Sequence, residues 1–254
     1  MPWPAAWSRA RRSQAALLVT AVLLVASLWL LGAVLALLPE PIGSNAAQFA
    51  AGARTTLWLT LLSGAIGLAL GTLAALGRTS KHALARGAAG FYLWVIRGTP
   101  LLVQILFVYF ALPLLVPGWN LPDFAAAVVA LSVNVGAYNA EAIRAGLLAV
   151  PRSQTEAARA LGLQPLQVMV HVVAPQAIRV ALPPLANNLV ALLKDSSLAF
   201  AIGVVELTNI GNRVQAATFQ PVATLATTAC IYLLLTTLLT QASDALEHRW
   251  SAGL

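Results

Sequence analysis

Two adjacent residues of opposite charge, Lys194 and Asp195, stand in an apolar segment that also carries Asn187. Charged groups in such a segment should face protein or water, because exposing them to lipid is costly. An ammonium and a carboxylate that face a cavity are the groups that would bind the carboxylate and the ammonium of a zwitterionic amino acid. Alternatively, the two charges satisfy one another and fix helix packing; adjacent helical residues point about 100° apart, so one of them alone could face a cavity.

Other polar residues mark the ends or the interior of further apolar segments. Gln104 is the most informative of these, because an uncharged membrane span has little reason to hold an amide unless a polar partner or water lies opposite it. Arg97 either lines the same path or anchors the chain at the membrane interface, with Thr99 beginning the next helix. Glu141 and Arg144 have the i, i+3 spacing of an ion pair, which would form an inner gate, a contact to a cytoplasmic loop or a surface pair.

The sequence offers no catalytic or metal-binding pattern. His82, His171 and His248 are scattered and lack cysteine or carboxylate neighbours at the spacing of a metal site. No G-x-x-x-x-G-K-[ST] sequence is present, so the chain lacks the backbone cradle for ATP phosphates. We therefore expect no enzyme active site, no metal and no bound cofactor in this chain.

The elements that hold these residues must be membrane helices. Apolar residues make up 59% of the chain and charged residues 9%, and the mean hydropathy is +0.81. These values are far too apolar for an ordinary soluble domain of this length. The net charge of +7 comes from basic residues scattered between long apolar segments, a pattern that sets membrane orientation rather than nucleic-acid binding.

The apolar segments predict about six transmembrane helices with both ends of the chain in the cytoplasm, because most Arg and Lys residues then fall inside. Pro183 and Pro184 should open the fifth span. The G-x-x-x-G spacing of Gly67 and Gly71 either allows close helix packing or reflects how common glycine is in membrane helices. The predicted spans are residues 15–38, 55–77, 100–116, 124–143, a fifth after residue 184, and 222–243. Residues 83–96 should lie along the inner interface, anchored by Tyr92 and Trp94. The predicted outer loops are residues 39–45, 117–123 and 206–221.

A polar stretch between the fourth and fifth spans predicts a helical elbow. Residues 153–156 have the S-x-x-E form of a capping box, so a helix should begin near Gln154. Gly162 can adopt a left-handed conformation and end that helix, Pro165 suits the first turn of a second helix, and Pro175 should end it. Such an elbow, with a small and smooth face, would fit a groove on another protein, or it would be an ordinary hairpin between spans.

Several spaced motifs resemble one family. The elbow reads E-A-A, three residues, Gly, nine residues and a hydrophobic segment ending at Pro175, with Ala174 where the family usually has Leu. This pattern resembles the cytoplasmic coupling loop of permease subunits of bacterial ABC importers. The following motifs are similar to the polar amino-acid branch of that family, of the histidine and glutamine type: R-G-T-P-L-L-V-Q at residues 97–104, A-Y at 137–138 with Glu141 and Arg144, and L-L-K-D-S-S-L at 192–198 with E-L at 206–207. The resemblance covers about residues 52–245.

The resemblance implies an all-α integral membrane protein of the type I importer fold that moves polar amino acids across the bacterial inner membrane. Residues 52–245 would form its five-helix core with a coupling loop at residues 151–175, preceded by an additional helix within residues 1–51 and followed by a cytoplasmic tail at residues 246–254. The residues that would couple to an ATPase are Glu156, Ala157, Ala158, Gly162 and Pro175. The residues that would line the substrate path or its gate are Arg97, Thr99, Gln104, Glu141, Arg144, Asn187, Lys194, Asp195, Ser196 and Glu206.

The resemblance also implies partners, since one such chain cannot complete the path. These are a dimer of cytoplasmic ABC ATPases that uses ATP and Mg²⁺, a second permease subunit that is identical or homologous, and an extracytoplasmic substrate-binding protein. One alternative is a secondary transporter driven by an ion gradient, which would usually show inverted repeats that this sequence lacks. The other is a membrane partner subunit that uses the elbow only to hold another protein.

Overall fold

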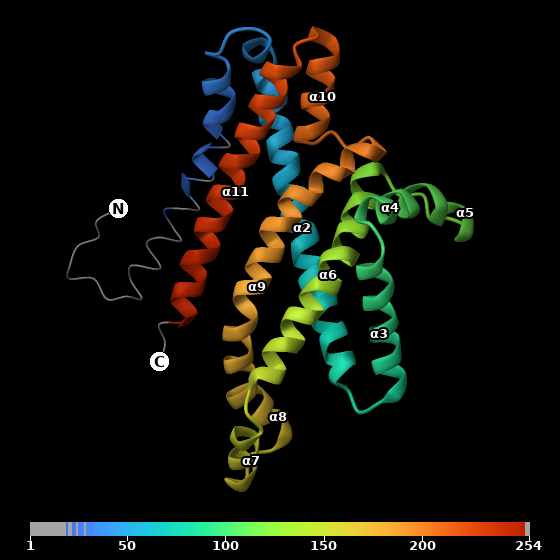
Figure 1. Ribbon diagram of the computed structural model, residues 1–254, viewed down its shortest axis with the longest axis vertical. Helices are drawn as coiled ribbons and strands as arrows, with labels where there is room; N and C mark the ends of the chain where they lie inside the picture. The colour runs from blue at the N-terminus through green and yellow to red at the C-terminus, as the bar shows by residue number, and fades with distance from the viewer. Residues whose placement is uncertain (1–18, 20–21, 24, 28, 252–254) are drawn as a thin grey trace, which may run out of the picture.

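The computed structural model describes residues 19, 22–23, 25–27 and 29–251, and in these residues the chain forms only helices and the turns that join them (Figure 1). The all-α prediction is therefore confirmed. The predicted N-terminal tail, residues 1–14, and the beginning of the predicted first span lie outside the described residues. Residues 29–35, near the end of that span, are helical.

Four described helices are long and apolar enough to cross a membrane. They are α2 (Ile42–Thr79), α6 (Asp123–Ala149), the helix Pro165–Ile202 and most of α11 (Pro221–Ser251). A bent pair, α3 (Ala83–Gly98) followed by the helix Leu101–Leu115, is a fifth candidate. These elements agree with the predicted five-helix core, although α2 begins well before the predicted residue 55.

The central helix of the bundle is α6. In its most apolar window 72% of the residues are buried, against 33% or less in the other three spans. Its closest neighbour is α2, which approaches it through Gly67 and Gly71. A Cβ atom on Gly71 would lie 2.7 Å from Asn139 Cβ and 2.8 Å from Gly136 O. The G-x-x-x-G spacing therefore serves close packing of α2 on α6.

The bent pair reverses the roles predicted for its two halves. α3 packs along α2 and α6, and the Tyr92 hydroxyl donates to Val133 O of α6 at 2.6 Å, so this ring is a contact within the bundle rather than an interfacial anchor. After α3 the chain bends by 110° at Thr99 and Pro100. The segments α4 (Leu101–Leu106), η1 (Phe107–Ala111) and α5 (Leu112–Leu115) then project sideways from the bundle (Figure 1). The prediction that residues 83–96 lie along the interface while residues 100–116 span was wrong.

The helix that follows the elbow is continuous, and the prediction that Pro175 ends it was wrong. The segments α8 (Pro165–Val168), η2 (Met169–Val173), α9 (Ala174–Asp195) and η3 (Ser196–Ile202) follow one another without a gap. Pro183 and Pro184 lie inside α9 rather than at the start of a new span. The two ends of this helix therefore belong to one rod.

Two π-type turns explain how prolines are tolerated in these helices. In η2 the N–H of Ala174 bonds to Met169 O, five residues back, directly before Pro175. In η1 the N–H of Leu112 bonds to Phe107 O directly before Pro113. A proline ring in an α-helix clashes with the carbonyl four residues back, and a wider turn relieves that clash.

The predicted outer loop at residues 206–221 is mostly a helix, α10 (Leu207–Thr218). Leu207, Ile210 and Val214 recur at the helical period and are buried against α2 and α11. The helix ends at Phe219, whose φ of 54° lies in the left-handed region. The prediction failed because the polar residues between these apolar positions suggested a loop.

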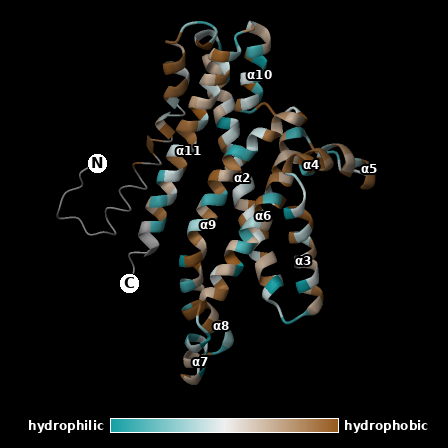
Figure 2. Cartoon of the chain, viewed as in Figure 1, coloured by the Kyte–Doolittle hydropathy of each residue, from teal (hydrophilic) through white to brown (hydrophobic). Residues whose placement is uncertain are grey.

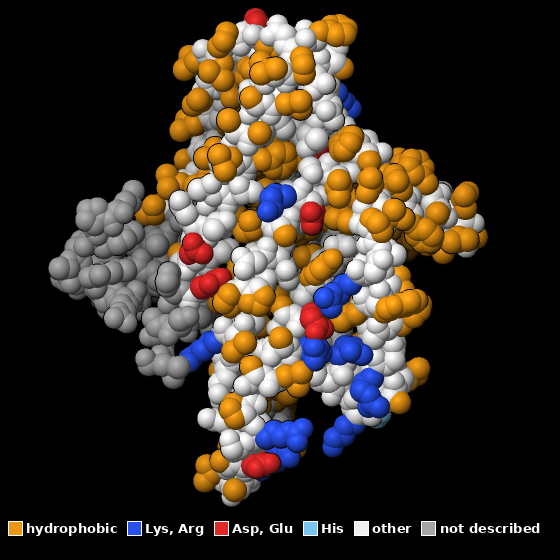
Figure 3. All heavy atoms as spheres, in the orientation of Figure 1, with side chains coloured by type: hydrophobic (Ala, Val, Ile, Leu, Met, Phe, Trp, Pro, Cys, Tyr) orange, Lys and Arg blue, Asp and Glu red, His pale blue; other side chains and the backbone are white. Residues whose placement is uncertain are grey.

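The two ends of the bundle differ in polarity. Lys and Arg side chains gather at the end that carries α7 (Arg152–Ala160), α8 and the turn between α2 and α3 (Figure 3). The same end is rich in hydrophilic residues, whereas α5 and the upper part of α11 are hydrophobic (Figure 2). This is the distribution that the positive-inside rule expects for a cytoplasmic end at the elbow.

The tight α2–α6 contact generates a prediction about stability. Gly71→Ala should lower the free energy of unfolding by about 1–3 kcal/mol, because the added methyl meets backbone atoms of α6 that cannot move aside easily. The measurement is the thermal unfolding midpoint of the purified protein in detergent. Gly87→Ala is the matched control, since no atom lies within 4 Å of the added methyl there. Equal midpoints for the two variants would contradict the role assigned to Gly71.

Candidate functional site

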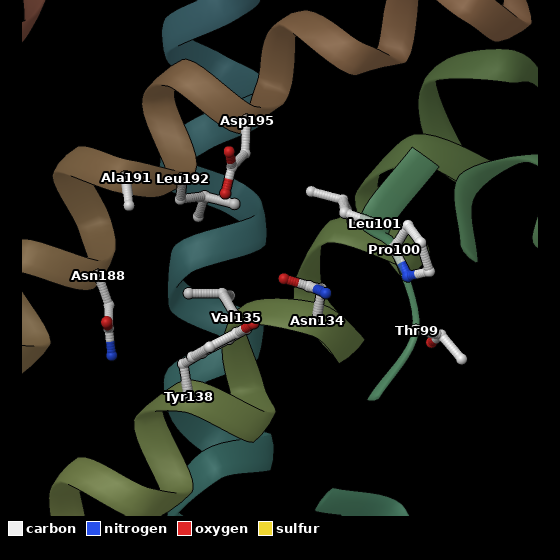
Figure 4. Close-up of a pocket in the computed structure, with 10 residues that line it drawn as sticks. All are labelled: Thr99, Pro100, Leu101, Asn134, Val135, Tyr138, Asn188, Ala191, Leu192 and Asp195. Carbon is white, nitrogen blue, oxygen red and sulfur yellow. The ribbon is translucent and has the colours of Figure 1, made fainter. Parts of the chain in front are cut away.

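A cavity of about 350 Å³ lies between the middle of α6, the end of α9 and the turn that begins α4 (Figure 4). Its size falls within the range of about 300–1,000 Å³ that is usual for small-molecule sites. Its wall mixes apolar and polar side chains, as such sites do. The lining residues are Thr99, Pro100, Leu101, Asn134, Val135, Tyr138, Asn188, Ala191, Leu192 and Asp195.

The charge pair of the fifth span is divided between cavity and surface. Asp195 is half-buried and lines the cavity, whereas Lys194 is exposed. No ion pair joins the two in the described part of the chain. The two asparagines about two helical turns earlier are divided in the same way, because Asn187 is exposed and Asn188 lines the cavity.

Gln104 is buried behind the cavity wall and joins the turn after α3 to α6. Its Nε2 donates to Ile96 O at 2.7 Å, to Thr99 O at 3.1 Å and to Thr99 Oγ1 at 2.9 Å. Its Oε1 accepts from Asn134 Nδ2 at 3.0 Å. Asn134 is therefore the polar partner that the presence of an amide in this span predicted.

A second cavity of about 430 Å³ lies beside the first, between α2, α3 and α6. Arg97 and Glu141 line it together with Arg78. The guanidinium of Arg97 lies 5.7 Å from the centre of the Tyr138 ring, and Tyr138 also lines the first cavity. Arg144 forms the predicted ion pair with Glu141. Arg97 and Glu141 thus lie next to the amino-acid-sized cavity rather than within it.

Two other predicted path residues lie away from both cavities. Ser196 is buried, and its hydroxyl donates to Leu193 O at 2.7 Å. Glu206 is fully buried at the start of α10, where its carboxylate accepts from the N–H groups of Thr208 and Asn209, both at 2.8 Å. The same carboxylate accepts from the Tyr232 hydroxyl at 2.9 Å. Glu206 therefore fastens α10 to α11.

The elbow forms as predicted around Gly162, but its first helix begins differently. α7 starts at Arg152 after Pro151, without a side-chain cap, so the predicted capping box at residues 153–156 was wrong. The helix begins two residues earlier than predicted, with Pro151 as its N-cap residue, which places Ser153 inside the first turn. A capping box forms instead at the start of α8, where the Gln164 N–H donates to Gln167 Oε1 at 2.9 Å.

The end of α7 is a Schellman motif. Gly162 has a φ of 82°, its N–H bonds to Arg159 O at 2.9 Å, and the Leu163 N–H bonds to Ala158 O at 3.2 Å. A left-handed residue at this position favours glycine. The motif fixes the angle between α7 and α8.

The elbow has a small core of its own and an apolar outer surface. Ala158, Val168 and Val173 are buried in that core. Glu156, Ala157 and Gly162 are exposed, and Pro175 is half-buried in the helix that leaves the elbow. Leu161 and Leu166 are also exposed, at 83% and 73%. The predicted smooth face therefore carries two projecting leucines.

The comparisons with known proteins decide the family. Residues 67–252 match the model of the binding-protein-dependent transport system inner membrane component. The chain belongs to that family. The permease is 40% identical over 198 residues to the glutamine transport system permease protein of Escherichia coli K12, which covers 78% of this chain and 90% of the relative. It is 39% identical over 197 residues to the L-cystine transport system permease protein of Bacillus subtilis 168, an alignment that covers 76% of this chain and 82% of the relative.

Solved structures agree with this assignment. The permease is 38% identical to a chain of the crystal structure of an amino acid ABC transporter with histidines, with a TM-score of 0.75 over 81% of this chain and 95% of the other. An inward-facing methionine ABC transporter shares the fold, with a TM-score of 0.68 at 22% identity. The protein is a membrane permease subunit of an ABC transport system, and neither a gradient-driven transporter nor a non-transporting partner subunit.

Sequence reasoning missed most of the cavity's polar wall in the permease. Asn134 and Tyr138 stand four residues apart on α6 and line the cavity together. Asn139, next to them, accepts from Asn188 Nδ2 at 3.0 Å and so ties α6 to α9. The signal that could have found them is this concentration of amides and a phenol along one apolar span, which needs polar partners within the protein.

The buried carboxylate of Glu206 generates a prediction about stability. Glu206→Ala should lower the free energy of unfolding by about 2–4 kcal/mol, because each buried donor left unpaired costs about 1–3 kcal/mol. The measurement is thermal unfolding in detergent. Glu40→Ala, which removes an exposed carboxylate, is the control and should change the midpoint little. If both variants unfold at the wild-type temperature, Glu206 does not fasten α10.

Proposed function

We propose that the permease carries polar amino acids into the bacterial cytoplasm through the cavity at Asp195, driven by a separate ATPase that engages the elbow at residues 151–175. The observation that carries this proposal is the continuous helix Pro165–Ile202. One of its ends is the second helix of the elbow, and its other end holds Asn188 and Asp195. A displacement of the elbow would therefore move two side chains of the cavity wall together with it, as one rigid body.

The chemistry of the cavity supports an amino acid as cargo. Asp195 supplies a carboxylate for an ammonium, and Arg97, on the far side of the Tyr138 ring, supplies a guanidinium for a carboxylate. The named relatives transport glutamine and L-cystine, both of which carry these two groups. Lys194, the predicted partner for the substrate carboxylate, is exposed and is left to a second subunit or to solvent.

Two elbows in the assembled transporter would each sit in a groove of one ATPase subunit. The projecting Leu161 and Leu166 would enter that groove, and Glu156 and Ala157 would line its rim. ATP and Mg²⁺ would be held by the ATPase dimer, and the permease itself would bind no cofactor. Closure of the dimer on ATP would draw the elbows together and open the cavity outward.

The remaining partners follow from the surface. Figure 3 shows charged side chains of both signs at mid-height on one face of the bundle, which lipid would not cover cheaply. We propose that a second permease subunit, identical or homologous, covers this face. An extracytoplasmic substrate-binding protein would deliver the amino acid at the end that carries α10. With the elbow on the cytoplasmic side of the bacterial inner membrane, both chain termini would lie in the cytoplasm.

The elbow generates a prediction about ATPase binding. Gly162→Leu should reduce the ATPase recovered with the tagged permease about tenfold, because a side chain at this left-handed residue costs about 1–2 kcal/mol and tilts α7 against α8. Gly118→Leu is the matched control: Gly118 has a φ of 86°, and both glycines have open space around them. The control should retain the ATPase, since Gly118 lies in the turn between α5 and α6, away from the elbow. Equal recovery with the two variants would remove the elbow from the coupling interface.

The cavity generates a prediction about transport. Asp195→Asn should reduce ATP-driven amino-acid uptake into proteoliposomes about tenfold or more, because a charge-assisted hydrogen bond to the substrate ammonium is lost. The variant should still bind the ATPase. Asp244→Asn, on an exposed position of α11, is the control and should transport normally. Wild-type uptake by the Asp195 variant would show that the substrate passes elsewhere.

A further inference from the structure

We propose that Gln104 is a positioning residue that fixes the amide of Asn134 with its oxygen toward the cavity, and that the cavity therefore prefers cationic amino acids. This inference rests on the proposed function, since it assumes that the cavity receives an amino acid. It goes further in naming the chemical class of the substrate and the residue that sets it.

The orientation of the Gln104 amide is forced by backbone atoms. Its nitrogen lies 2.7 Å from Ile96 O and 3.1 Å from Thr99 O. Carbonyl oxygens only accept hydrogen bonds, so the amide nitrogen and not the amide oxygen must point at them. A flipped amide would place Gln104 Oε1 against Ile96 O and Thr99 O in a buried position without a hydrogen between them, which is strongly unfavourable.

The orientation of Asn134 follows from that of Gln104. With its nitrogen committed, Gln104 presents Oε1 to α6, and Asn134 must meet it with a donor. Asn134 Nδ2 does so at 3.0 Å. The Asn134 oxygen is thereby turned away from Gln104 and into the cavity, toward the side on which Leu192 and Asp195 lie (Figure 4).

The other polar groups of the wall also present acceptors. The Thr99 hydroxyl donates its hydrogen to Val95 O at 2.9 Å, so only lone pairs remain. Asn188 donates Nδ2 to Asn139 Oδ1 at 3.0 Å, which leaves its own oxygen free. Besides the second N–H of each asparagine amide, the groups able to donate are few: the Tyr138 hydroxyl lines the cavity, Arg97 lies behind that ring, and Lys194 is exposed.

The Asp195 carboxylate adds a negative charge to this set of acceptors. In the described part of the chain no basic side chain lies within 4.0 Å of it. A half-buried carboxylate without a basic partner gains most from a ligand that brings a positive charge and several N–H donors. A cationic amino acid offers such donors at both its α-ammonium and its side chain, and an acidic one offers them only at the α-ammonium.

Equilibrium binding of labelled arginine and glutamate to the purified permease–ATPase complex, with the binding protein left out, tests this inference. Wild type should bind arginine at least about tenfold more tightly than glutamate. Gln104→Met frees the Asn134 amide to turn its nitrogen toward the cavity, so the ratio should fall toward one. Gln48→Met is the matched control, because Gln48 is exposed and bonds only to Asn45. It should keep the wild-type ratio.

A purely structural role for Gln104 would lower the amount of folded protein and leave the ratio unchanged, and that result would overturn the inference. If Gln104→Met does not fold, Asn134→Leu takes its place and should weaken arginine binding about tenfold while glutamate binding stays the same. Equal affinity of wild type for arginine and glutamate would also overturn it, with the proposed function intact. Absence of any amino-acid binding to the wild-type complex, together with normal uptake by Asp195→Asn, would instead remove the cavity from the transport path.

Discussion

The carbonyl groups freed at the end of α3 are the constraint on which the cavity depends. Pro100 has no N–H, so Ile96 O, which an α-helix would pair with residue 100, has no backbone donor. Within a membrane a freed carbonyl must be satisfied inside the protein. Gln104 Nε2 supplies the donor at 2.7 Å, and the Thr99 hydroxyl does the same for Val95 O at 2.9 Å. Two side chains thus replace backbone hydrogen bonds, and the bend they stabilise forms one wall of the cavity.

Proline shapes the rest of the fold through the same hydrogen-bond requirement, with different solutions. Before Pro113 and Pro175 the backbone widens into a π-type turn and the helix continues. At Pro100 the helix direction changes by 110° and side chains satisfy the carbonyls. The difference lies in the neighbours, since a glycine and a threonine precede Pro100 while apolar residues precede the other two. Flexible or hydrogen-bonding residues favour a break, and apolar ones favour continuity.

Several features that depend on local chemistry were predictable from the sequence, although the capping box at residues 153–156 and the helix end at Pro175 were not. The apolar spans, the left-handed end of α7 at Gly162, the start of α8 at Pro165 and the pairing of Glu141 with Arg144 all follow from neighbours within a few residues. Features that depend on distant segments were not. Nothing local to Gln104 identifies Asn134, 30 residues away, as its partner. Likewise, nothing local to Glu206 reveals that the Tyr232 hydroxyl, on another helix, donates a hydrogen bond to it. The roles of α3 and α4 were exchanged for the same reason, because packing on α2 and α6 decides which half lies in the bundle.

The continuity of the helix through Pro175 bears directly on how the proposed motion at the elbow would reach the cavity. A helix that ended at Pro175 would leave a flexible joint between elbow and span, and a displacement of the elbow would be absorbed there. The π-type turn keeps the rod intact from Pro165 to Ile202, while Asn139 on α6 holds Asn188 of the rod at 3.0 Å. A movement of the rod must therefore either carry α6 with it or break that hydrogen bond. Because α6 packs tightly on α2 at Gly67 and Gly71 and equally tightly on the rod at Gly146, where an added Cβ atom would collide with Ala177 O, the rod would carry α6 with it rather than break the asparagine contact.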